Sequence, residues 1–501
     1  MSAAGESTDR SGQQEQGLTH AYQRLYEHLR AAILTGQLKA GAKLPASRKF
    51  AIEQGVSRNT VLAALDQLYA EGYIETRPGS GTYVAKAIPD RMQRPRVRTV
   101  NGPASGRARS CLSERGRALA DVPRMPLPAI TGRSPNARAF QIGLPALEEF
   151  PRQVWARLYT TRIRGLSSTS LMRYDDPAGF RPLREQIAAH VATSRGIHCT
   201  ADQVVIVAGS QQGLEFASRL LLDPGETAWL EDPCYLGAKA ALTSAGARIA
   251  PVPVDRDGLD VNTGNELEPD ARLAIVTPSH QFPLGVTMTL ERRLALIEWA
   301  ERSNSWIVED DYDSEFRYRG HPLAALKAID PYHRVIYVGT FSKTMFPGLR
   351  LGYVIAPKDL TDAFAAAHLS TDVHPQLLDQ AVMADFLAEG HYARHVRRMR
   401  SLYGQRLRTL ITEVERELDV LCTDTPDGGL HLVAWLPDHL SDSVVSERAL
   451  SAGIHAWPLS LHVLHKSRPP ALLLGYAGTP VDEIPDAVGR LAETIAELVH
   501  P

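Results

Sequence analysis

The sequence predicts two domains of different fold class, a small α+β domain of helices with one β-hairpin and a large α/β domain on a mainly parallel sheet. The chain has 501 residues, 44% of them hydrophobic, which is several times the usual domain length. Its first part combines helical patterns with a single hairpin pattern. From Phe140 onward, near-continuous apolar runs alternate with helical patterns, as expected for parallel strands buried on both faces.

Charge divides the chain in the same way. Residues 18–138 carry 20 basic and 8 acidic side chains, a net charge of +12, whereas residues 139–501 carry 34 basic and 46 acidic ones, a net charge of −12. The basic first part indicates a module that binds a polyanion, although the net charge of the whole chain is only −2.

The spacing of the cysteines and the hydropathy of the chain indicate its cellular compartment and argue against some kinds of metal site. The cysteines are widely spaced and form no CxxC pair, which argues against a disulfide framework and a cysteine-only zinc site; they are Cys111, Cys199, Cys234 and Cys422. The first residues lack the apolar core of a signal peptide, and no uncharged apolar run reaches the roughly 20 residues needed to span a bilayer. We therefore expect a cytoplasmic protein without a membrane partner or a metal.

The first element after a polar tail, residues 1–17, which we expect to be disordered, is a helix. In AYQRLYEHLRAAILTG the apolar residues recur at helical spacing, and Gly36 follows as a stop signal. PASRKFAIEQG predicts a short second helix with Ser47 as a possible N-cap, and VSRNTVLAALDQLYAEG predicts a third with Ser57 as N-cap. Two helices joined by a few residues around a glycine are typical of a helix-turn-helix.

A hairpin completes this domain, which we place at residues 18–86. YIETRPGSGTYV contains two β-rich runs, Tyr73–Thr76 and Thr82–Val84, around a Pro-Gly-Ser-Gly turn. Helices followed by a hairpin make a winged helix-turn-helix. Residues 87–138 then read as a basic, proline-rich linker: a flexible spacer, or a spacer that also touches DNA phosphates, since counterion release requires only charge and reach.

The large domain, residues 139–501, is predicted from apolar, β-rich runs. We expect strands in the segments 204–209, 226–232, 273–278, 305–311, 334–340 and 350–357. Helical patterns between them predict a three-layer α/β body.

Lys343 is the strongest candidate for chemistry. It lies in YVGTFSKTMFPGLRLGY, just after a predicted buried strand, in a turn rich in hydroxyl groups and seven residues before Arg350. These are the parts needed for an imine with an aldehyde, with hydroxyls and an arginine to hold a phosphate. The alternative is an ordinary surface lysine.

A second segment, WIVEDDYDSEFRY, places Asp310 and Tyr312 at the end of a predicted strand. A carboxylate there can pair with a protonated pyridine nitrogen, and a tyrosine hydroxyl can hydrogen-bond a phenolic oxygen of the same ring. A divalent-ion site or a solvated turn is the alternative. The 33-residue step from Asp310 to Lys343 would span a crossover helix and one strand, which brings both residues to the same edge of a parallel sheet.

Three further turns follow predicted strands. VVIVAGSQQGLEF predicts a strand, a Gly-Ser-Gln-Gln-Gly turn with Ser210 and Gln211, and a helix whose N-terminus can receive a phosphate. Tyr235, in WLEDPCYLG, could cover one face of a cofactor ring. In TPSHQFPLG, either His280 or Gln281 could polarise a ring oxygen, although a lone histidine more often serves packing and hydrogen bonding.

Taken together, these motifs resemble a known combination of domains. LPASR, VSRNTV and EGYIETRPGSGTYV match the pattern of GntR-type winged helices, and AGSQQGL, EDPCY, TPSHQFPLG, EDDYDSEFRY and GTFSKTMFPGLRLGY follow the order found in fold-type I aminotransferases. The chain is similar to the MocR/GabR subfamily of bacterial transcription regulators. This resemblance implies a winged helix-turn-helix domain followed by a pyridoxal-phosphate-dependent, aminotransferase-like domain.

The resemblance also implies roles for the site residues. Lys343 would form the imine with pyridoxal 5′-phosphate, Asp310 would meet the pyridine nitrogen and Tyr312 the phenolic oxygen, and Tyr235 would stack on the ring. The phosphate would be held by Ser210, Gln211, Thr340, Ser342 and Arg350.

One stretch departs from the aminotransferase pattern. Enzymes of this fold usually carry an arginine near the C-terminus that clamps the substrate carboxylate, but here ALLLGYAG places Leu473 at that position. His462, His465, Lys466 and Arg468 lie nearby in the sequence as possible substitutes.

The leading hypothesis is a regulator that binds double-stranded operator DNA and senses an amine or amino-acid effector, or pyridoxal phosphate itself. A working aminotransferase with an appended DNA-binding domain is the alternative, and a DNA-binding protein with a degenerate, cofactor-free body is a third. We expect a homodimer, side by side or domain-swapped, that binds paired half-sites. Predicted DNA contacts lie at the recognition helix and the wing: Arg48, Ser57, Arg58, Asn59, Thr60, Arg77 and Gly79.

Overall fold

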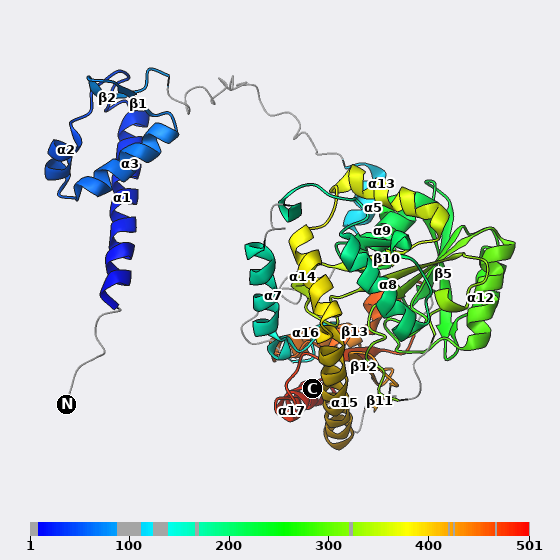
Figure 1. The fold of residues 1–501 in the computed structure, drawn as a ribbon. Coiled ribbons are helices and arrows are strands. Elements are labelled where there is room, and N and C mark those ends of the chain that lie inside the picture. The colour runs from blue at the N-terminus through cyan, green and yellow to red at the C-terminus, as the bar shows by residue number, and fades with distance from the viewer. Residues whose placement is uncertain are drawn as a thin grey trace, which may run out of the picture. The chain divides into compact units, whose positions relative to one another are not determined.

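The computed structural model describes residues 9–87, 112–123, 139–165, 170–319, 324–418, 421–423, 426–465 and 468–499, with the backbone alone for residues 9–21 and 422. The chain divides into two compact units, Met1–Ser110 and Cys111–Pro501 (Figure 1). Each unit has its own hydrophobic core and is described separately.

The first unit is the predicted winged helix-turn-helix. It contains α1 (Asp9–Thr35), α2 (Ser47–Gln54), α3 (Arg58–Ala70) and the hairpin strands β1 (Ile74–Arg77) and β2 (Gly81–Val84), which pair antiparallel. Its core joins the apolar stripes of the helices to the hairpin, because residues such as Leu29 of α1, Leu68 of α3 and Val84 of β2 are buried together.

Local details of this unit differ in part from the sequence-based expectations. The α1 helix begins at Asp9, so residues 9–17, which we expected to be disordered, are helical. Ser47 is not the N-cap of α2, because the helix begins at Ser47 itself and Ala46 occupies the cap position without a side-chain hydrogen bond. The predicted cap of α3 is confirmed, since the Ser57 side chain accepts a hydrogen bond from the Thr60 N–H.

The second unit is built on an eight-stranded sheet with the order β3-β10-β9-β8-β7-β4-β5-β6. Each of the six predicted strands is present, as β3 (Val204–Val207), β4 (Thr227–Asp232), β7 (Leu273–Val276), β8 (Trp306–Asp311), β9 (Val335–Thr340) and β10 (Gly352–Ile355). Two further strands, β5 (Arg248–Asp255) and β6 (Gly258–Leu259), were not predicted from the sequence. Strands β4, β5, β7, β8 and β9 are parallel, whereas β10 runs antiparallel to both of its neighbours.

Helices cover both faces of this sheet, as expected for a three-layer body. One face packs on α9 (Ser210–Leu221), α10 (Leu236–Ala245) and α13 (Thr361–Thr371). The other packs on α8 (Arg181–Arg195) and α12 (Leu290–Arg302). Side chains alternate along the strands. Val308 of β8 packs on the face covered by α9, α10 and α13, and its neighbour Ile307 packs on the opposite face.

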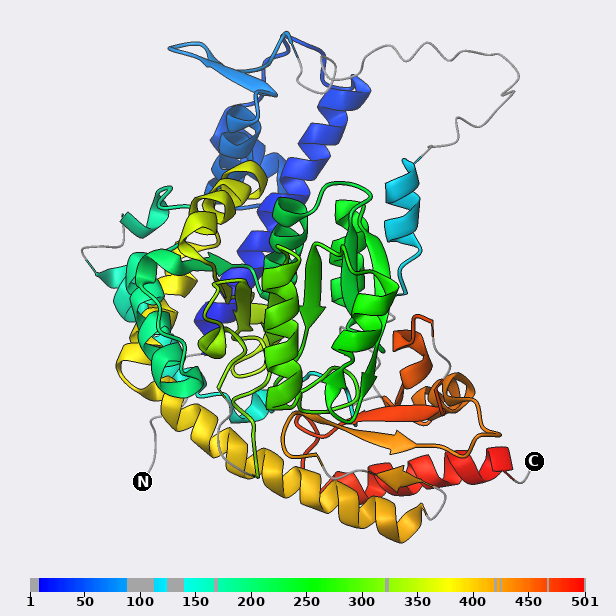
Figure 2. The same ribbon diagram turned by 90° about the vertical axis from the view of Figure 1, so that its right-hand side faces the viewer.

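A smaller sheet follows towards the C-terminus, with the order β11-β12-β14-β13. Figure 2 shows its strands in orange and red beside the long helix α15 (His391–Glu417) and the last helix α17 (Ile484–Val499). The remaining elements are α7 (Arg152–Arg164), α11 (Val261–Leu267), α14 (Leu377–Ala388), α16 (Asp442–Ser451), β11 (Cys422–Thr423), β12 (His431–Trp435), β13 (Trp457–Pro458) and β14 (Ala471–Gly475). None of the described helices is both long and apolar enough to cross a membrane.

The segment predicted as a linker contains a helix that belongs to the second unit. Helix α5 (Glu114–Ala120) is capped by Ser113, whose side chain accepts from the Gly116 N–H, and it packs against α10. The second unit therefore begins near residue 111 rather than at residue 139. The rest of the predicted linker, 88–111 and 124–138, lies outside the described residues.

The connection between β8 and β9 also differs from the expectation. Within residues 312–319 and 324–334 there is no α-helix, only the short 3-10 turn Lys327–Ile329. The predicted crossover helix is therefore wrong for the described part of this connection. Because β8 and β9 are adjacent and parallel, their carboxyl ends nevertheless lie side by side.

Candidate functional site

A cavity of about 380 Å³ opens at the carboxyl edge of the large sheet. Its lining comes from the ends of several strands and from the turns that follow them, as is usual for ligand sites in α/β proteins. Nine of the predicted site residues line this cavity: Ser210, Gln211, Tyr235, Asp310, Tyr312, Thr340, Ser342, Lys343 and Arg350.

Lys343 lies in the turn that follows β9, three residues beyond Thr340. Its Nζ donates a hydrogen bond to the carbonyl oxygen of Gly143 at 3.0 Å. Burial lowers the pKa of the Lys343 ammonium, while Asp313 and Asp310 act in the opposite direction, so the amine loses its proton more easily than an exposed lysine and is the better nucleophile. Gly143 is required at this contact, because its φ is +69° and a β-carbon there would lie 2.5 Å from Nζ.

Asp310 lies on β8, and its carboxylate faces a position that the protein leaves unfilled. Its Oδ1 is buried and has no hydrogen-bond partner among the residues that the structure describes. Burial and the neighbouring Asp311 raise the pKa of Asp310 to about 7. A buried, unpartnered carboxylate is costly, and a cationic N–H donor, such as a protonated pyridine, would satisfy it.

The N-terminus of α9 and Arg350 form the anion-binding end of the cavity. Gly209, with φ of +99°, turns the chain from β3 into α9, whose first residue is Ser210. The Arg350 guanidinium donates to the Ala208 carbonyl at 2.6 Å, and it lies so close to Gly209 that a β-carbon there would be 3.2 Å away. Free N–H groups at a helix start, together with this guanidinium, suit a phosphate.

Two hydroxyl residues extend this end of the cavity from β9. The Ser342 N–H donates to Thr340 Oγ1 at 3.1 Å, so the turn that carries Lys343 is fixed to its own strand. Both Thr340 and Ser342 are buried. From the opposite side, Gln211 Nε2 donates to the Gly237 carbonyl at 2.8 Å, which orients its amide.

Two tyrosines contribute aromatic rings to the cavity. Tyr235 packs edge-on against Phe282, with ring centroids 5.9 Å apart. The Tyr312 hydroxyl lies 2.9 Å from His280 Nδ1, which also lies 3.0 Å from Asp313 Oδ2. Burial raises the pKa of the Tyr312 hydroxyl well above its ordinary value, so the hydroxyl keeps its proton at neutral pH.

His280 and Gln281, which we expected to meet a ring oxygen, are not among the residues that line this cavity. Gln281 is fully engaged in the protein, because its Nε2 donates to Glu231 and to two carbonyls and its Oε1 accepts from Leu284. His280 reaches the cavity only through its contact with Tyr312. This arrangement favours a role of His280 in packing and hydrogen bonding over direct contact with a ring oxygen.

The far end of the cavity was not foreseen from the sequence, except for His462, which was considered as a possible substitute for the usual arginine. It is formed by side chains from distant segments, namely Ile142, Phe282, Leu430, His431 and His462. Burial lowers the pKa of both histidines to about 4, so both are neutral at pH 7. His462 donates from Nδ1 to the Cys234 carbonyl and accepts from Trp457 Nε1, and His431 donates from Nε2 to the Pro283 carbonyl.

Leu473, at the position of the usual arginine, is fully buried in an apolar cluster that includes Ile142 and Phe282. Arg468 does not replace it, because this guanidinium donates to the carbonyls of Asp232 and Val254 and is absent from the cavity lining. Lys466 lies outside the described residues. Among the described lining residues, only Lys343 and Arg350 are cationic.

The first unit presents part of its predicted contact surface to solvent. Arg48, Arg58 and Asn59 are exposed. Thr60 is buried, and the side chain of Ser57, also exposed, is engaged in the cap of α3. In the wing, Arg77 pairs with Glu75 at 2.5 Å and covers the Tyr83 ring at 4.5 Å, while Gly79 takes a φ of +73° at the turn.

Comparisons with known proteins agree with both units. Residues 21–84 match the family described as bacterial regulatory proteins, gntR family, and residues 149–491 match aminotransferase class I and II. The chain is 41% identical to the probable rhizopine catabolism regulatory protein MocR of Rhizobium meliloti over 95% of this chain and 94% of that protein. The chain belongs to the MocR family of GntR-type transcription regulators. Another relative, the regulator TauR of Rhodobacter capsulatus, is 33% identical over 94% of this MocR-type chain and 96% of its own.

Solved structures resemble the second unit of this MocR-type regulator. The α-aminoadipate aminotransferase LysN of Thermus thermophilus, complexed with N-(5′-phosphopyridoxyl)-L-leucine, has a TM-score of 0.70 and 27% identity, covering 77% of this chain and 97% of that one. The kynurenine aminotransferase of Pyrococcus horikoshii has a TM-score of 0.71 and 27% identity, covering 78% and 98%.

Family and geometry together assign pyridoxal 5′-phosphate to the cavity of this MocR-type protein. The cavity offers an unpartnered Asp310 oxygen, the half-buried Lys343 amine and the helix start at Ser210, three groups whose chemistry suits a pyridine nitrogen, an aldehyde and a phosphate. Among the described residues, no group of three His, Cys, Asp or Glu side chains is arranged to hold a metal ion.

Proposed function

We propose that this regulator binds its operator in the cytoplasm as a homodimer and that its aminotransferase-like domain senses an amine or amino acid through bound pyridoxal phosphate. The observation that carries the proposal is the buried Asp310 oxygen without a partner, within a cavity that Lys343 also lines. Buried polar groups are normally hydrogen-bonded, so an unpartnered carboxylate oxygen that faces a cavity supports a ligand that completes it.

In this proposal each lining residue has one task. Lys343 supplies the amine that holds the cofactor covalently, Asp310 keeps the ring nitrogen protonated, and Arg350 with the start of α9 binds the phosphate. Tyr235 covers the ring, and Tyr312 donates to the phenolic oxygen from a hydroxyl positioned by His280. The bound cofactor supplies a reversible covalent reaction with primary amines, which makes it a detector for them.

A Lys343→Ala substitution tests the covalent anchor. We expect the purified variant to lose the visible absorbance band of bound pyridoxal phosphate, while Lys358→Ala, on an exposed side chain, keeps it. The variant should still bind operator DNA but should no longer respond to amines. Borohydride reduction that labels a lysine other than Lys343 would show that the anchor is misassigned.

A working aminotransferase remains the second candidate, because groups for the ring and the phosphate are all present in the cavity. Sustained transamination also requires recognition of two substrates in succession, for which the apolar far end offers no carboxylate clamp in the described residues. A coupled transamination assay over many amino donors separates the two functions. Turnover of roughly 1–1000 per second would favour the enzyme, and binding without turnover favours the sensor.

A further inference from the structure

A second cavity, of about 450 Å³, lies behind the cofactor cavity. Among the described residues, the two have no lining residue in common, and a thin wall of three segments, 277–282, 310–313 and 428–431, separates them. Along the wall, neighbouring residues line opposite cavities: Tyr312 lines the cofactor cavity and Asp313 the second one.

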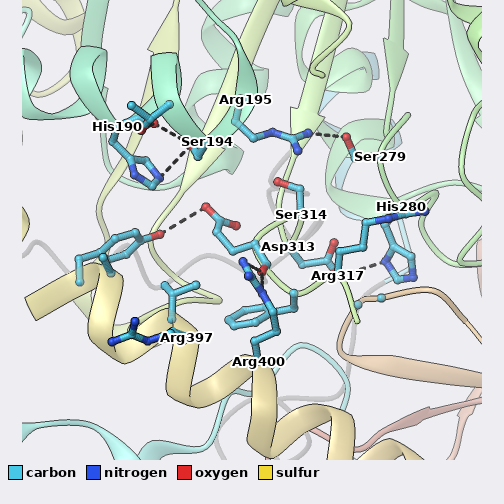
Figure 3. Close-up of a pocket in the computed structure, with 18 of the residues that line it drawn as sticks. His190, Ser194, Arg195, Ser279, His280, Asp313, Ser314, Arg317, Arg397 and Arg400 are labelled. Atoms are coloured by element: carbon cyan, nitrogen blue, oxygen red, sulfur yellow. Dashed lines mark hydrogen bonds and ion pairs between the residues drawn. The ribbon is translucent and has the colours of Figure 1, made fainter. Parts of the chain in front are cut away.

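The second cavity is rich in guanidinium groups. Figure 3 shows Arg195 and Ser279 on one side of it and Arg397 and Arg400, both on α15, on the other. Arg195 is already paired, with Asp311 at 2.8 Å. Arg317 lines the same cavity and pairs with Asp427 at 3.1 Å.

Arg397 and Arg400 differ from these paired arginines. Within the described residues, Arg400 donates only to the backbone carbonyl of Glu315, and neither Arg397 nor Arg400 has a carboxylate partner there. The acidic side chains that line the same cavity neutralise the positive charge of these two arginines only in part. Asp313 is held by His280, and burial with the neighbouring Asp311 raises the pKa of Glu315 to about 7, so its charge is weakened near neutral pH.

The wall also carries a link between the cavities. His280 lines the second cavity, and its Nδ1 contacts both Asp313, which faces the second cavity, and Tyr312, which faces the first. His280 Nε2 is buried and has no hydrogen-bond partner in the described part of the chain. Gly429, another lining residue, leaves room beside it, because a β-carbon there would lie 2.6 Å from Nε2.

We propose that the second cavity binds a small organic or inorganic oxyanion and that His280 couples this site to Tyr312 in the cofactor cavity. Guanidinium groups recognise carboxylate and phosphate alike, by paired hydrogen bonds, and the volume suits a small metabolite. A DNA duplex is excluded as the occupant, since it carries its phosphates on a convex cylinder that is wider than a cavity of this size.

Binding is tested by calorimetry on the cofactor-loaded full chain, in a buffer free of carboxylates and phosphate. Succinate and inorganic phosphate distinguish the two kinds of oxyanion, and succinamide is the uncharged control. We expect saturable binding of at least one anion and none of succinamide. Absence of saturable binding by both anions at 10 mM would overturn the proposal.

Arginine variants locate the site. Arg397→Gln and Arg400→Gln should each weaken anion binding by about tenfold or more, the loss expected for one charge-assisted hydrogen bond. Arg408→Gln removes the same charge from an exposed position of the same helix outside the cavity and should bind like the wild type. Equal weakening in Arg408→Gln and Arg397→Gln would indicate a general charge effect and refute the site.

The coupling is tested on the visible absorbance of the bound cofactor. The anion should change this absorbance with half-saturation at the calorimetric dissociation constant, and Arg397→Gln should shift both by the same factor. Binding in the calorimeter without any absorbance change would overturn the coupling through His280. This outcome is independent of the amine response, so the sensor proposal stands or falls separately.

Discussion

Asp310 shows how a single residue links stability to ligand binding. Its folded-state pKa of about 7 lies above the ordinary aspartate value of 3.8, so the cofactor-free protein binds a proton that the unfolded chain releases. The resulting penalty is absent below about pH 4, grows as the pH rises, and is complete above about pH 7. In the proposed arrangement, bound cofactor removes this penalty.

We therefore predict that Asp310→Asn stabilises the cofactor-free protein at pH 8, by about 3 °C or more in melting temperature, and by much less at pH 5. The same substitution should weaken retention of pyridoxal phosphate. Asp362→Asn, at an exposed position of α13, serves as control and should show no such pH dependence. Differential scanning calorimetry at the two pH values measures the effect, and an equal shift at both would contradict it.

Leu473 lies in the apolar cluster behind Ile142 and Phe282, two residues that line the far end of the cavity. A carboxylate placed among Ile142, Phe282 and two neutral histidines would lose its hydration without gaining a cation. We predict that 3-aminopropan-1-ol changes the cofactor absorbance at a concentration at least about tenfold lower than β-alanine does. In Leu473→Arg the order should reverse, whereas Leu473→Met should resemble the wild type. Tighter binding of β-alanine to the wild type would show that a carboxylate clamp exists.

At the scale of elements, α3 separates groups that hold the helix from groups that can read DNA. Ser57 and Thr60 are engaged in the cap and the core, and Arg58 and Asn59 remain exposed at the first turn. A recognition helix enters the major groove with this turn, where arginine pairs with guanine. Arg77 of the wing is held by Glu75 and Tyr83, which suits a phosphate contact.

We predict that Arg58→Ala costs about 1–3 kcal/mol on the cognate operator and relaxes base preference, whereas Arg77→Ala weakens binding evenly and lowers the salt slope by about 1. Titrations of cognate and scrambled duplexes at several salt concentrations measure both. If Arg58→Ala binds the cognate site as tightly as the wild type at the same salt, α3 is not the reading helix.

The elements that the sequence predicts best are those with a local signal. Apolar runs identified β8, which carries Asp310, and β9, which Lys343 follows, and their positions at the strand ends brought both residues to one cavity. The strand β5 was missed because its sequence, RIAPVPVD, contains two prolines and alternates in burial. Neither the antiparallel direction of β10 nor the contribution of Ile142 and His431 has a local signal, because both depend on segments that meet only in the folded chain.

For the whole molecule, the proposed homodimer makes a quantitative prediction about the operator. Two winged helices related by a two-fold axis should require two half-sites, and loss of one half-site should reduce affinity by at least about a hundredfold. Sedimentation of the cofactor-loaded protein at micromolar concentration should give twice the chain mass of 54.9 kDa. A monomer with cofactor bound would contradict this arrangement.

The anchoring of α5 on the second unit sets the length of the connection to the DNA-binding domain. Only 24 residues separate Ala87 from Leu112, so whatever their conformation they span at most roughly 90 Å, about half the reach of a connection extending to residue 138. Effective concentration falls roughly as the −3/2 power of tether length. At its other end, α5 is followed by Pro123, which lines the cofactor cavity. The shorter tether thus raises the effective concentration of one DNA-binding domain at the second half-site about threefold.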